Sequence, residues 1–326
     1  MVTGGAGFVG SHVVDELIGL GQEVVVLDNL SGGFRANVNV SARFLEGSIN
    51  DSELVKRLFE EEKFDFVFHL AAYAAEGLSH FIRKFNYENN LIGSINLINA
   101  AVNHETKCFV FTSSIAVYGE AQVPMREDVI PRPEDPYGIA KYAVELDLQN
   151  AKRLFDLNYI IFRPHNIYGE RQNIGDKYRN VIGIFINQIM NGEPLTIFGD
   201  GNQQRAFSYI GDVAPIIARC VFEPEVYNQV FNIGADVPLT VNEVAKIVSQ
   251  TFNVAPKLLH LPERREVKYA FSDHSKLKKV FGDQAKVSFE EGVRRMILWA
   301  KKAGVQSSKK FEDIEITKNL PPSWRG

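Results

Sequence analysis

Short runs of apolar residues alternate, in the first half of the chain, with stretches in which apolar residues recur every three or four positions. The apolar runs are typical of buried parallel strands and cover residues 23–27, 64–70, 108–112 and 159–162. The stretches with three- or four-residue spacing predict helices over residues 52–62, 78–103 and 136–155. Because strands alternate with helices, the pattern predicts an α/β fold with a doubly wound parallel sheet.

The alternation weakens after Arg163, where proline, glycine and asparagine become frequent. Helical spacing returns over residues 181–190, 212–222, 241–252 and 289–302. A length of 326 residues suits two modest units, since a domain takes on the order of 150 residues. We therefore divide the chain into residues 1–164, which hold the parallel sheet, and residues 165–326, a smaller α/β lobe of which parts return to the sheet.

The composition is that of a globular protein, with 45% apolar residues, 23% charged residues and a formal net charge of −4. The high apolar fraction and the low net charge exclude a mainly disordered chain. Nucleic acid is not expected as a partner, because no surplus of basic residues meets the phosphates. The two cysteines are too few for a cysteine-based metal site, and the histidines show no metal-ligand spacing, so no metal is expected. No apolar run approaches the roughly 18 residues of a membrane span, so we expect a cytoplasmic enzyme without a membrane partner.

A glycine-rich segment opens the chain, and the apolar residues after it have helical spacing. Gly4, Gly7 and Gly10 therefore form a turn before a helix N-terminus, where free backbone N–H groups favour a pyrophosphate. The next predicted strand leads to Asp28, about 20 positions further on, where a carboxylate accepts hydrogen bonds from an adenosine ribose and repels a 2′-phosphate. These features predict a Rossmann fold that binds NAD rather than NADP.

The strand expected before these glycines is almost absent, since only Met1, Val2 and Thr3 precede them. A Rossmann sheet has this strand at its centre. We therefore expect that the chain has lost the start of a central strand, through trimming or through a misplaced gene start.

Tyr137 and Lys141 are the strongest catalytic signal, because residues four positions apart lie on one face of a helix. An ammonium group beside the phenol favours phenolate and is expected to lower the tyrosine pKa. Asp135 is placed to cap this helix, with a proline at the first helical position. Ser114 follows the strand at 108–112, and the carboxyl end of a parallel strand is where such sheets bind their ligands. We predict that Ser114, Tyr137 and Lys141 are catalytic.

Taken in this order, the motifs resemble the extended short-chain dehydrogenase/reductase family, in particular its NAD-dependent nucleotide-sugar epimerases and dehydratases. The resemblance covers nearly the whole chain and is closest to enzymes of the UDP-glucose 4-epimerase type. The motifs that carry it are Gly-Gly-Ala-Gly-Phe-Val-Gly from Gly4, His69-Leu70-Ala71-Ala72, Asn89-Asn90, Ser113-Ser114-Ile115-Ala116-Val117-Tyr118-Gly119, the Tyr137 and Lys141 pair, Arg163-Pro164-His165-Asn166-Ile167-Tyr168-Gly169, and Gly199-Asp200-Gly201.

The resemblance implies a transient oxidation of a sugar hydroxyl. Tyr137, as phenolate, would take the hydroxyl proton while NAD+ accepts hydride from the same carbon. Ser114 would hydrogen-bond that oxygen, and Lys141 would hold the nicotinamide ribose. The residues implied around the dinucleotide are Gly4, Gly7, Phe8, Val9, Gly10, Asp28, Asn29, Ser48, Ile49, Leu70, Ala71, Ala72, Asn89, Thr112, Tyr137, Lys141 and Pro164. Ser48 departs from the family pattern, in which an Asp meets the adenine amino group.

The residues after the catalytic serine separate the branches of this family. Dehydratases carry Asp-Glu there, and nucleotide-sugar decarboxylases tend to carry a Glu, whereas this chain has Ile115 and Ala116, which cannot transfer a proton. A 3,5-epimerase would need a cysteine in this turn, and Cys108 and Cys220 lie outside it. The resemblance therefore implies NAD-dependent 4-epimerisation of a UDP-sugar, UDP-Glc or UDP-Gal, through a transient 4-keto sugar. A nucleotide-sugar dehydratase or decarboxylase is the alternative on the same scaffold.

The resemblance also implies substrate contacts from the second half of the chain. Beside Ser114, the matching positions are Asn166, Asn180 and Val181 near the diphosphate, Phe198 near the uracil ring, Arg205 and Arg264 on the diphosphate, and Ala270 in the sugar pocket. Arginine suits phosphate because its planar fork donates two hydrogen bonds. From the residues alone, Phe198 also fits a core strand, Arg205 a surface ion pair and Arg264 a solvated charge cluster.

Two positions bear on the choice of sugar. A residue as small as Ala270 leaves room for a 2-acetamido group, so we expect UDP-GlcNAc and UDP-GalNAc as further substrates. Arg171 can instead approach a C6 carboxylate, which leaves a UDP-glucuronate 4-epimerase open. A nucleotide-sensing module without activity is the alternative outside enzymes, although all three catalytic residues are present. The resemblance further implies a homodimer through the helices at 78–103 and 136–155.

Overall fold

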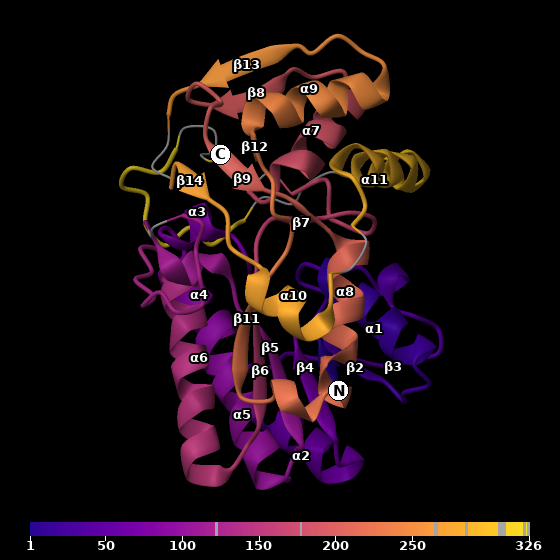
Figure 1. Ribbon diagram of the computed structural model, residues 1–326, viewed down its shortest axis with the longest axis vertical. Helices are drawn as coiled ribbons and strands as arrows, with labels where there is room; N and C mark the ends of the chain where they lie inside the picture. The colour runs from indigo at the N-terminus through magenta and orange to yellow at the C-terminus, as the bar shows by residue number, and fades with distance from the viewer. Residues whose placement is uncertain are drawn as a thin grey trace.

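The structure, a computed structural model, describes residues 1–120, 123–176, 178–263, 267–283, 286–305, 311–321 and 324. Its centre is a seven-stranded sheet of parallel strands in the order β11-β6-β5-β4-β1-β2-β3 (Figure 1). The strands are β1 (Val2–Thr3), β2 (Val25–Asp28), β3 (Arg43–Glu46), β4 (Phe66–His69), β5 (Cys108–Thr112), β6 (Tyr159–Pro164) and β11 (Gln229–Ile233). The chain builds outward from β1 through β2 and β3, then resumes on the other side with β4, so the predicted doubly wound fold is confirmed.

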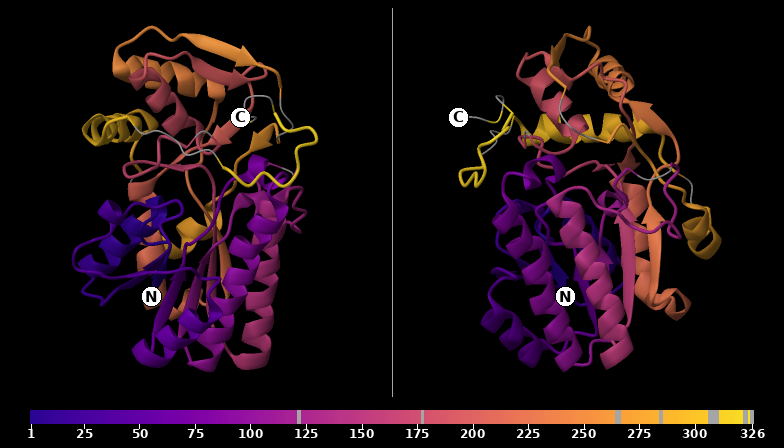
Figure 2. Two further views of the ribbon diagram at one scale, coloured as in Figure 1. Left: turned by 180° about the vertical axis from the view of Figure 1, so that it is seen from behind. Right: turned by 90° about the vertical axis from the view of Figure 1, so that its left-hand side faces the viewer.

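Helices cover both faces of this sheet (Figure 2). The covering helices are α1 (Phe8–Gly19) and α8 (Ile210–Arg219) on one face, and α2 (Ser52–Glu62), α5 (Gly93–Asn103) and α6 (Pro136–Phe155) on the other. Neighbouring strand residues point to opposite faces, so Val26 packs in the core with Val14 of α1, while Leu27 packs in the core with Leu97 of α5. This two-sided burial explains why the strands are nearly continuous apolar runs.

Four helices have the bounds that the sequence pattern predicts, namely α2, α6, α7 (Val181–Met190) and α9 (Val241–Phe252). Two more, α8 and α11 (Phe289–Ala303), differ from the predicted bounds by a few residues at their ends. At the start of α6, the Asp135 carboxylate accepts a hydrogen bond from the Gly138 amide at 2.9 Å, and Pro136 is the first helical residue. The predicted cap of the helix that carries Tyr137 is therefore confirmed.

The single helix predicted over residues 78–103 is wrong. The structure divides this segment into α3 (Glu76–Ser79), α4 (Arg83–Tyr87), a π-helical turn (Glu88–Ile92) and α5. A Cβ on Gly93 would lie 2.6 Å from a side-chain carbon of Ile49, so the chain passes close to the loop after β3 at this point. The apolar spacing continues across the π turn, which is why the sequence pattern does not reveal the breaks.

The remaining elements form the second lobe, above the carboxyl ends of the sheet strands in Figure 1. Its strands are β7 (Ile167–Tyr168) with β10 (Ser208–Tyr209), β8 (Leu195–Phe198) with β13 (Leu258–Leu261), and β9 (Gln204–Ala206) between β12 (Pro238–Thr240) and β14 (Tyr269–Ala270). Helices α7, α9 and α11 pack together there, whereas α10 (Ser275–Phe281) packs on β11. β11 and α8 come after residue 164 in the chain but belong to the layers of the parallel sheet. Parts of the second half of the chain therefore return to this sheet.

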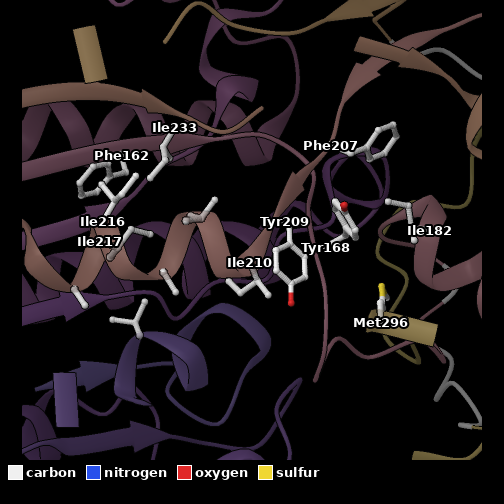
Figure 3. Packing of buried hydrophobic residues seen from close by; sticks show 14 of the residues in the cluster. Phe162, Tyr168, Ile182, Phe207, Tyr209, Ile210, Ile216, Ile217, Ile233 and Met296 are labelled. Carbon is white, nitrogen blue, oxygen red and sulfur yellow. The ribbon is translucent and has the colours of Figure 1, made fainter. Parts of the chain in front are cut away.

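One apolar core joins the sheet to the second lobe (Figure 3). It runs from Phe162 and Ile233 in the sheet across Ile217 of α8 to Ile182 of α7 and Met296 of α11, and all five side chains are buried. The two parts therefore pack as one body, and this packing holds the loops of the second lobe over the carboxyl ends of the strands.

Candidate active site

A cavity of about 390 Å³ opens beyond the carboxyl ends of the central strands, where ligands of doubly wound sheets bind. Its walls come from the glycine-rich loop before α1, the ends of β2, β4, β5 and β6, the first turns of α6, and residues 171–173, 176, 179 and 180. This volume is in the range of small-molecule sites. The structure thus brings residues from both halves of the chain to a single site.

The glycine-rich loop presents a bare helix end to the cavity. Gly7 is the N-cap of α1, no side chain caps this helix, and Phe8, Val9 and Gly10 line the cavity. The first N–H groups of a helix have no partner within the helix, and they carry the positive end of its dipole. Gly4 has φ +73°, and a Cβ on it would lie 2.6 Å from the Ala71 amide nitrogen, so only glycine lets the loop approach the end of β4. The loop therefore fits a diphosphate.

Asp28 ends β2 at the edge of the cavity. Its Oδ2 accepts a hydrogen bond from the Ala6 amide at 3.0 Å, and its Oδ1 accepts one from the Leu30 amide at 2.8 Å. Burial raises the pKa of Asp28, and these backbone hydrogen bonds oppose that effect. The carboxylate thus ties the end of β2 to the glycine-rich loop.

Ser114, Tyr137 and Lys141 meet at the end of β5. Ser114 lies close enough to Tyr137 for its hydroxyl to favour the phenolate, and Ser114 Oγ accepts a hydrogen bond from the Ala116 amide at 3.1 Å. Lys141 Nζ donates to the Thr112 carbonyl oxygen at 2.9 Å and lies 5.8 Å from the centre of the Tyr137 ring. Tyr137 and Lys141 are buried, and all three residues line the cavity. The three predicted catalytic residues therefore share one site.

Burial dominates the electrostatics of this group. It raises the pKa of Tyr137 well above the ordinary value, although the Ser114 hydroxyl and the charge of Arg179 favour the phenolate. Burial also lowers the pKa of Lys141 to about 7, against the opposing charge of Glu145. The prediction that Lys141 lowers the tyrosine pKa is therefore wrong for the protein by itself, because removal of the phenolate from water outweighs the neighbouring charges.

A buried ion pair links α6, the helix that carries Tyr137 and Lys141, to the neighbouring strands. Glu145, one turn after Lys141, accepts hydrogen bonds from Arg163 Nη2 at 2.5 Å and Nε at 3.0 Å, and from Ser113 Oγ at 2.5 Å. Arg163 Nη1 also donates to the Tyr118 hydroxyl at 2.8 Å. Because Ser113 directly follows β5 while Glu145 lies on α6 and Arg163 on β6, the network fixes these three elements relative to one another.

Arg171, Asp176 and Arg179 bring further charged groups to the cavity. Arg179 Nε donates to Asp176 Oδ2 at 2.6 Å, and its guanidinium lies 5.0 Å from the centre of the Tyr73 ring. Tyr73, Glu76, Asp176 and Arg179 all line the cavity. No motif or spacing in the sequence marks these four residues, so they were not predicted. The only signal was their position beside predicted site residues such as Asn180.

One family of known proteins matches most of this chain. The sequence model of the NAD dependent epimerase/dehydratase family matches residues 1–234. The chain belongs to this family. A UDP-glucose 4-epimerase of Mycolicibacterium smegmatis is 31% identical over 305 residues, which cover 91% of this chain and 96% of that protein.

Two solved structures of the family are also similar to this one. A UDP-glucose 4-epimerase of Thermotoga maritima, crystallised with UDP-glucose, has a TM-score of 0.89 at 38% identity and covers 93% of this chain and 98% of its own. A UDP-glucose 4-epimerase of Thermus thermophilus, in complex with NAD, has a TM-score of 0.86 at 34% identity and covers 91% of this chain and 97% of its own. As a member of the NAD-dependent epimerase/dehydratase family, the chain is a nucleotide-sugar enzyme with NAD as its cofactor.

The cavity fits this cofactor. Each residue that the sequence predicts around the dinucleotide lines it, namely Gly4, Gly7, Phe8, Val9, Gly10, Asp28, Asn29, Ser48, Ile49, Leu70, Ala71, Ala72, Asn89, Thr112, Tyr137, Lys141 and Pro164. Three buried oxygens of lining residues, Thr112 Oγ1, Gln172 Oε1 and Asn180 Oδ1, have no hydrogen-bond partner within the described part of the chain. Buried polar atoms are rarely left unpaired, so a bound ligand is suited to satisfy them.

The predicted substrate contacts are only partly brought together. Asn166 and Asn180 line the cavity, whereas Val181, Phe198, Arg205 and Ala270 are not among the residues that line it. Arg205 donates to the backbone carbonyls of Gln204, Val267 and Lys268. Ala270 is buried in an apolar cluster with Ile115 and Met125. Arg264 lies outside the described residues.

The described residues show neither a candidate metal site nor a candidate membrane span. In the ranges that the structure describes, no group of three or more His, Cys, Asp or Glu side chains could hold a metal ion. The same described residues contain no helix that is both long enough and apolar enough to span a bilayer.

Proposed function

We propose that the protein interconverts the C4 epimers of a UDP-sugar, with UDP-Glc and UDP-Gal as the first pair. The proposal rests on one feature of the cavity, in which Ser114, Tyr137 and Lys141 meet. The turn directly after Ser114 holds Ile115 and Ala116. Neither of these two side chains can give or take a proton. The named activities of similar proteins support the same reaction.

In this reaction Tyr137 removes the proton from the 4-hydroxyl group of the sugar and later returns it. Bound NAD+ supplies the acceptor of the C4 hydride, and in its reduced form the donor. Ser114 hydrogen-bonds the same sugar oxygen, while the charge of Arg179 opposes the effect of burial on the Tyr137 pKa. The product would be the C4 epimer, because a hydride lost from one face of C4 would be regained on the other face. Substrate and product therefore have the same mass.

Glu76 favours a second candidate, the dehydratase or decarboxylase branch. Glu76 lines the cavity, and its charge raises the pKa of Tyr137, so it lies on the same side of the cavity as that tyrosine. After oxidation at C4, a carboxylate there can remove a proton from a neighbouring carbon. We prefer the epimerase because the position next to Ser114, which carries the further acid in those branches, is filled by Ile115.

The UDP-glucuronate alternative receives less support. Arg171 lines the cavity, but its guanidinium forms an ion pair with Asp15 at 2.7 Å and donates to the Ser11 carbonyl oxygen at 3.3 Å. Both partners belong to α1, beside the glycine-rich loop. Arg171 would have to leave them to meet a C6 carboxylate of the sugar.

We also propose a homodimer through the surface of α6 and the adjoining π turn. Five large apolar side chains are exposed there: Ile92, Ile139, Leu146, Leu154 and Phe155. Ile139 and Leu146 are seven residues apart, so they share one face of α6. A second copy with the same stripe would cover it in a two-fold interface. Light scattering should report a dimer, and Leu146→Glu should shift it to monomer, while Leu298→Glu on α11 should not.

The direct experiment is to incubate the purified protein with a panel of UDP-sugars and to identify the products by NMR and mass spectrometry. The proposal expects 4-epimers of unchanged mass, with UDP-Glc and UDP-Gal converted into one another. A product that is lighter by water or by carbon dioxide would favour the second candidate. Denaturation of the same sample should release NAD, which can be quantified separately.

A further inference from the structure

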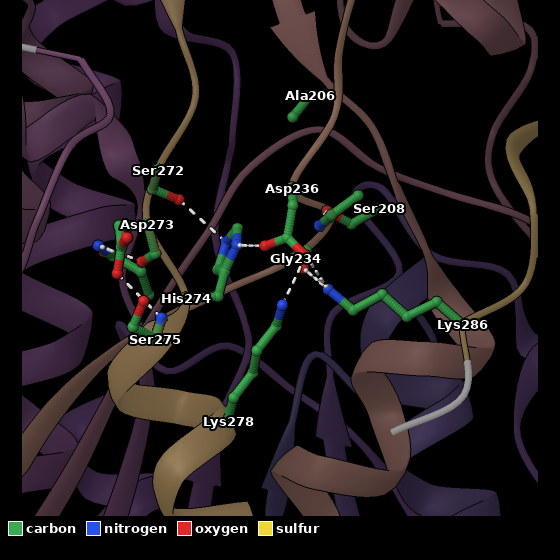
Figure 4. A network of polar contacts seen from close by, with 12 residues as sticks. Ala206, Ser208, Gly234, Asp236, Ser272, Asp273, His274, Ser275, Lys278 and Lys286 are labelled. Carbon is green, nitrogen blue, oxygen red and sulfur yellow. Dashed lines mark hydrogen bonds and ion pairs between the residues drawn. The ribbon is translucent and has the colours of Figure 1, made fainter. Parts of the chain in front are cut away.

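A second cluster of titratable side chains, which includes Asp236, His274, Lys278 and Lys286, lies outside the cavity (Figure 4). His165 follows β6, Asp236 lies shortly after β11, and His274 is the N-cap residue of α10. Both imidazole residues are only 2% exposed, and their Nε2 atoms lie 3.1 Å apart. The proposed reaction uses neither histidine.

The Nδ1 atoms of both rings face groups that only accept hydrogen bonds. His165 Nδ1 lies 3.0 Å from the carbonyl oxygen of Ala206. His274 Nδ1 lies 2.7 Å from Oδ1 of Asp236, and the hydrogen bond from His274 holds the pKa of that carboxyl well below its ordinary value. Each Nδ1 must therefore carry a hydrogen. A neutral imidazole has only one N–H, so two neutral rings would face each other with lone pairs on both Nε2 atoms.

The Ser272 hydroxyl does not remove this conflict. Its oxygen lies 3.1 Å from His274 Nε2, so it can donate to that nitrogen. The lone pair of His165 Nε2 would still face His274 Nε2 at 3.1 Å, and no described group would donate a hydrogen bond to it. One additional proton between the rings satisfies both nitrogens, because one ring becomes an imidazolium and donates to the other. We propose that His165 and His274 share one buried proton, carried by His274, which fastens the cavity wall to the second lobe.

The surrounding charges assign this proton to His274. The charged groups that face the pair are Asp236, Asp273, Lys278 and Lys286. Asp236 contacts His274, and no ion pair reaches His165 from the described residues. Burial, together with the charge of His274, lowers the pKa of His165 to about 3, so the pair takes no second proton near neutral pH. Lys278 and Lys286 lie 3.0 and 3.2 Å from the same carboxylate, so they share Asp236 with His274 (Figure 4).

The histidine pair is linked to the cavity through the two residues beside His165 in the sequence. Pro164 and Asn166 both line the cavity, and Asn166 Nδ2 donates to the Ala206 carbonyl at 3.2 Å, the same oxygen that His165 contacts. A Cβ on Gly234 would lie 2.7 Å from His165 Nε2, so the ring is closely packed. Without the proton, the two rings repel each other in this confined space and Asn166 moves with His165. Because the contact exists only while the proton is bound, its contribution is present at lower pH and is lost as the pH rises.

Side-chain ¹⁵N NMR of the full-length protein tests the proton directly and does not depend on the proposed reaction. At about pH 6.5 we expect one ring with two protonated nitrogens and one neutral ring protonated at Nδ1, assigned by the loss of signals in His274→Gln and His165→Gln. The exposed His80 gives a signal from a solvent-accessible ring in the same spectrum. Two neutral rings at this pH would overturn the proposal.

Two variants separate a shared proton from a merely structural contact. Asp236→Asn keeps the shape of the side chain but removes the charge that stabilises the His274 imidazolium. The shared proton should therefore be lost at a lower pH than in the wild type. The loss of thermal stability should shift to the same lower pH. His274→Gln can donate to His165 without titrating and should remove that pH dependence. In the wild type, KM for the UDP-sugar should rise over the same pH range while kcat changes less, and this readout alone rests on the proposed function. Equal loss of stability at every pH in Asp236→Asn, or an unchanged pH profile in His274→Gln, would contradict the shared proton.

Discussion

Lys141 Nζ lies 2.9 Å from the carbonyl oxygen of Thr112, so the catalytic helix is attached to the strand end from which Ser114 continues. The same ammonium lies 4.6 Å from the centre of the Phe111 ring in a buried setting. Burial at the carboxyl end of β5 therefore both places Lys141 in the site and lowers its pKa. This relationship gives a dependence of stability on pH.

The free energy of unfolding should rise with pH between about 7 and about 10 because of Lys141. Burial lowers its pKa from 10.5 to about 7, so in this range the unfolded chain binds a proton that the folded protein does not. Below about 7 both states hold the proton, and the contribution no longer changes. Denaturant unfolding at a series of pH values should show the rise in the wild type and a smaller one in Lys141→Met. Lys84→Met, with an exposed ammonium, should keep the full rise, and the same rise in Lys141→Met would contradict this assignment.

Tyr137→Phe should lower kcat by about 100-fold or more, because it removes the group that accepts the sugar proton. NAD should stay bound, since the phenyl ring keeps the cavity wall. The measurement is turnover of a UDP-sugar together with NAD released on denaturation. Tyr269→Phe, at an exposed tyrosine outside the cavity, should retain turnover. Near-normal activity of Tyr137→Phe would refute the proposed mechanism.

Arg179→Ala should shift the rise of kcat with pH to higher pH, because the charge of Arg179 lowers the pKa of Tyr137. Without this charge the phenolate forms at higher pH, so kcat at neutral pH should fall and recover partly as the pH rises. The pH profile of kcat checks this. Arg179→Lys should restore part of the effect, and a uniform loss at every pH would speak against it.

Arg205→Ala tests the diphosphate contact that the family resemblance implies. In the structure the guanidinium donates to three backbone carbonyls, so we expect a lower melting temperature and little change in KM. Thermal unfolding and substrate kinetics on the same preparation distinguish the two roles. A large rise in KM at unchanged stability would instead assign Arg205 to the substrate.

Ala270→Tyr tests the expectation that 2-acetamido sugars are accepted. Ala270 packs with Ile115, directly after Ser114, so a larger side chain should push this turn toward the sugar. Turnover should fall more for UDP-GlcNAc than for UDP-Glc. Equal losses on both sugars would show that position 270 does not select the substituent.

The features that were predicted correctly depend on local chemistry. The bounds of α6 follow from Asp135, Pro136 and continuous apolar spacing, and the glycine-rich loop follows from glycines that no other residue can replace. The Rossmann fold and the cofactor follow from the order of these motifs along the chain. Such signals survive in a single sequence because each depends on a few neighbouring residues.

The features that were missed depend on contacts between distant segments. Arg179 reaches the site because Asp176 and Tyr73 hold its guanidinium, and no spacing in the sequence indicates this. The raised Tyr137 pKa depends on burial, which the Tyr137 and Lys141 pair cannot reveal by itself. In the same way, the contact between His165 and His274 joins residues more than one hundred positions apart.

The most direct test of the central claim is the conversion of UDP-Gal by the NAD-loaded protein in D₂O, followed by NMR and mass spectrometry. The account predicts UDP-Glc of unchanged mass with no deuterium on any sugar carbon, because the C4 hydride stays within the site. A product lighter by water or carbon dioxide, deuterium on a carbon next to C4, or no conversion of any UDP-sugar would contradict 4-epimerisation.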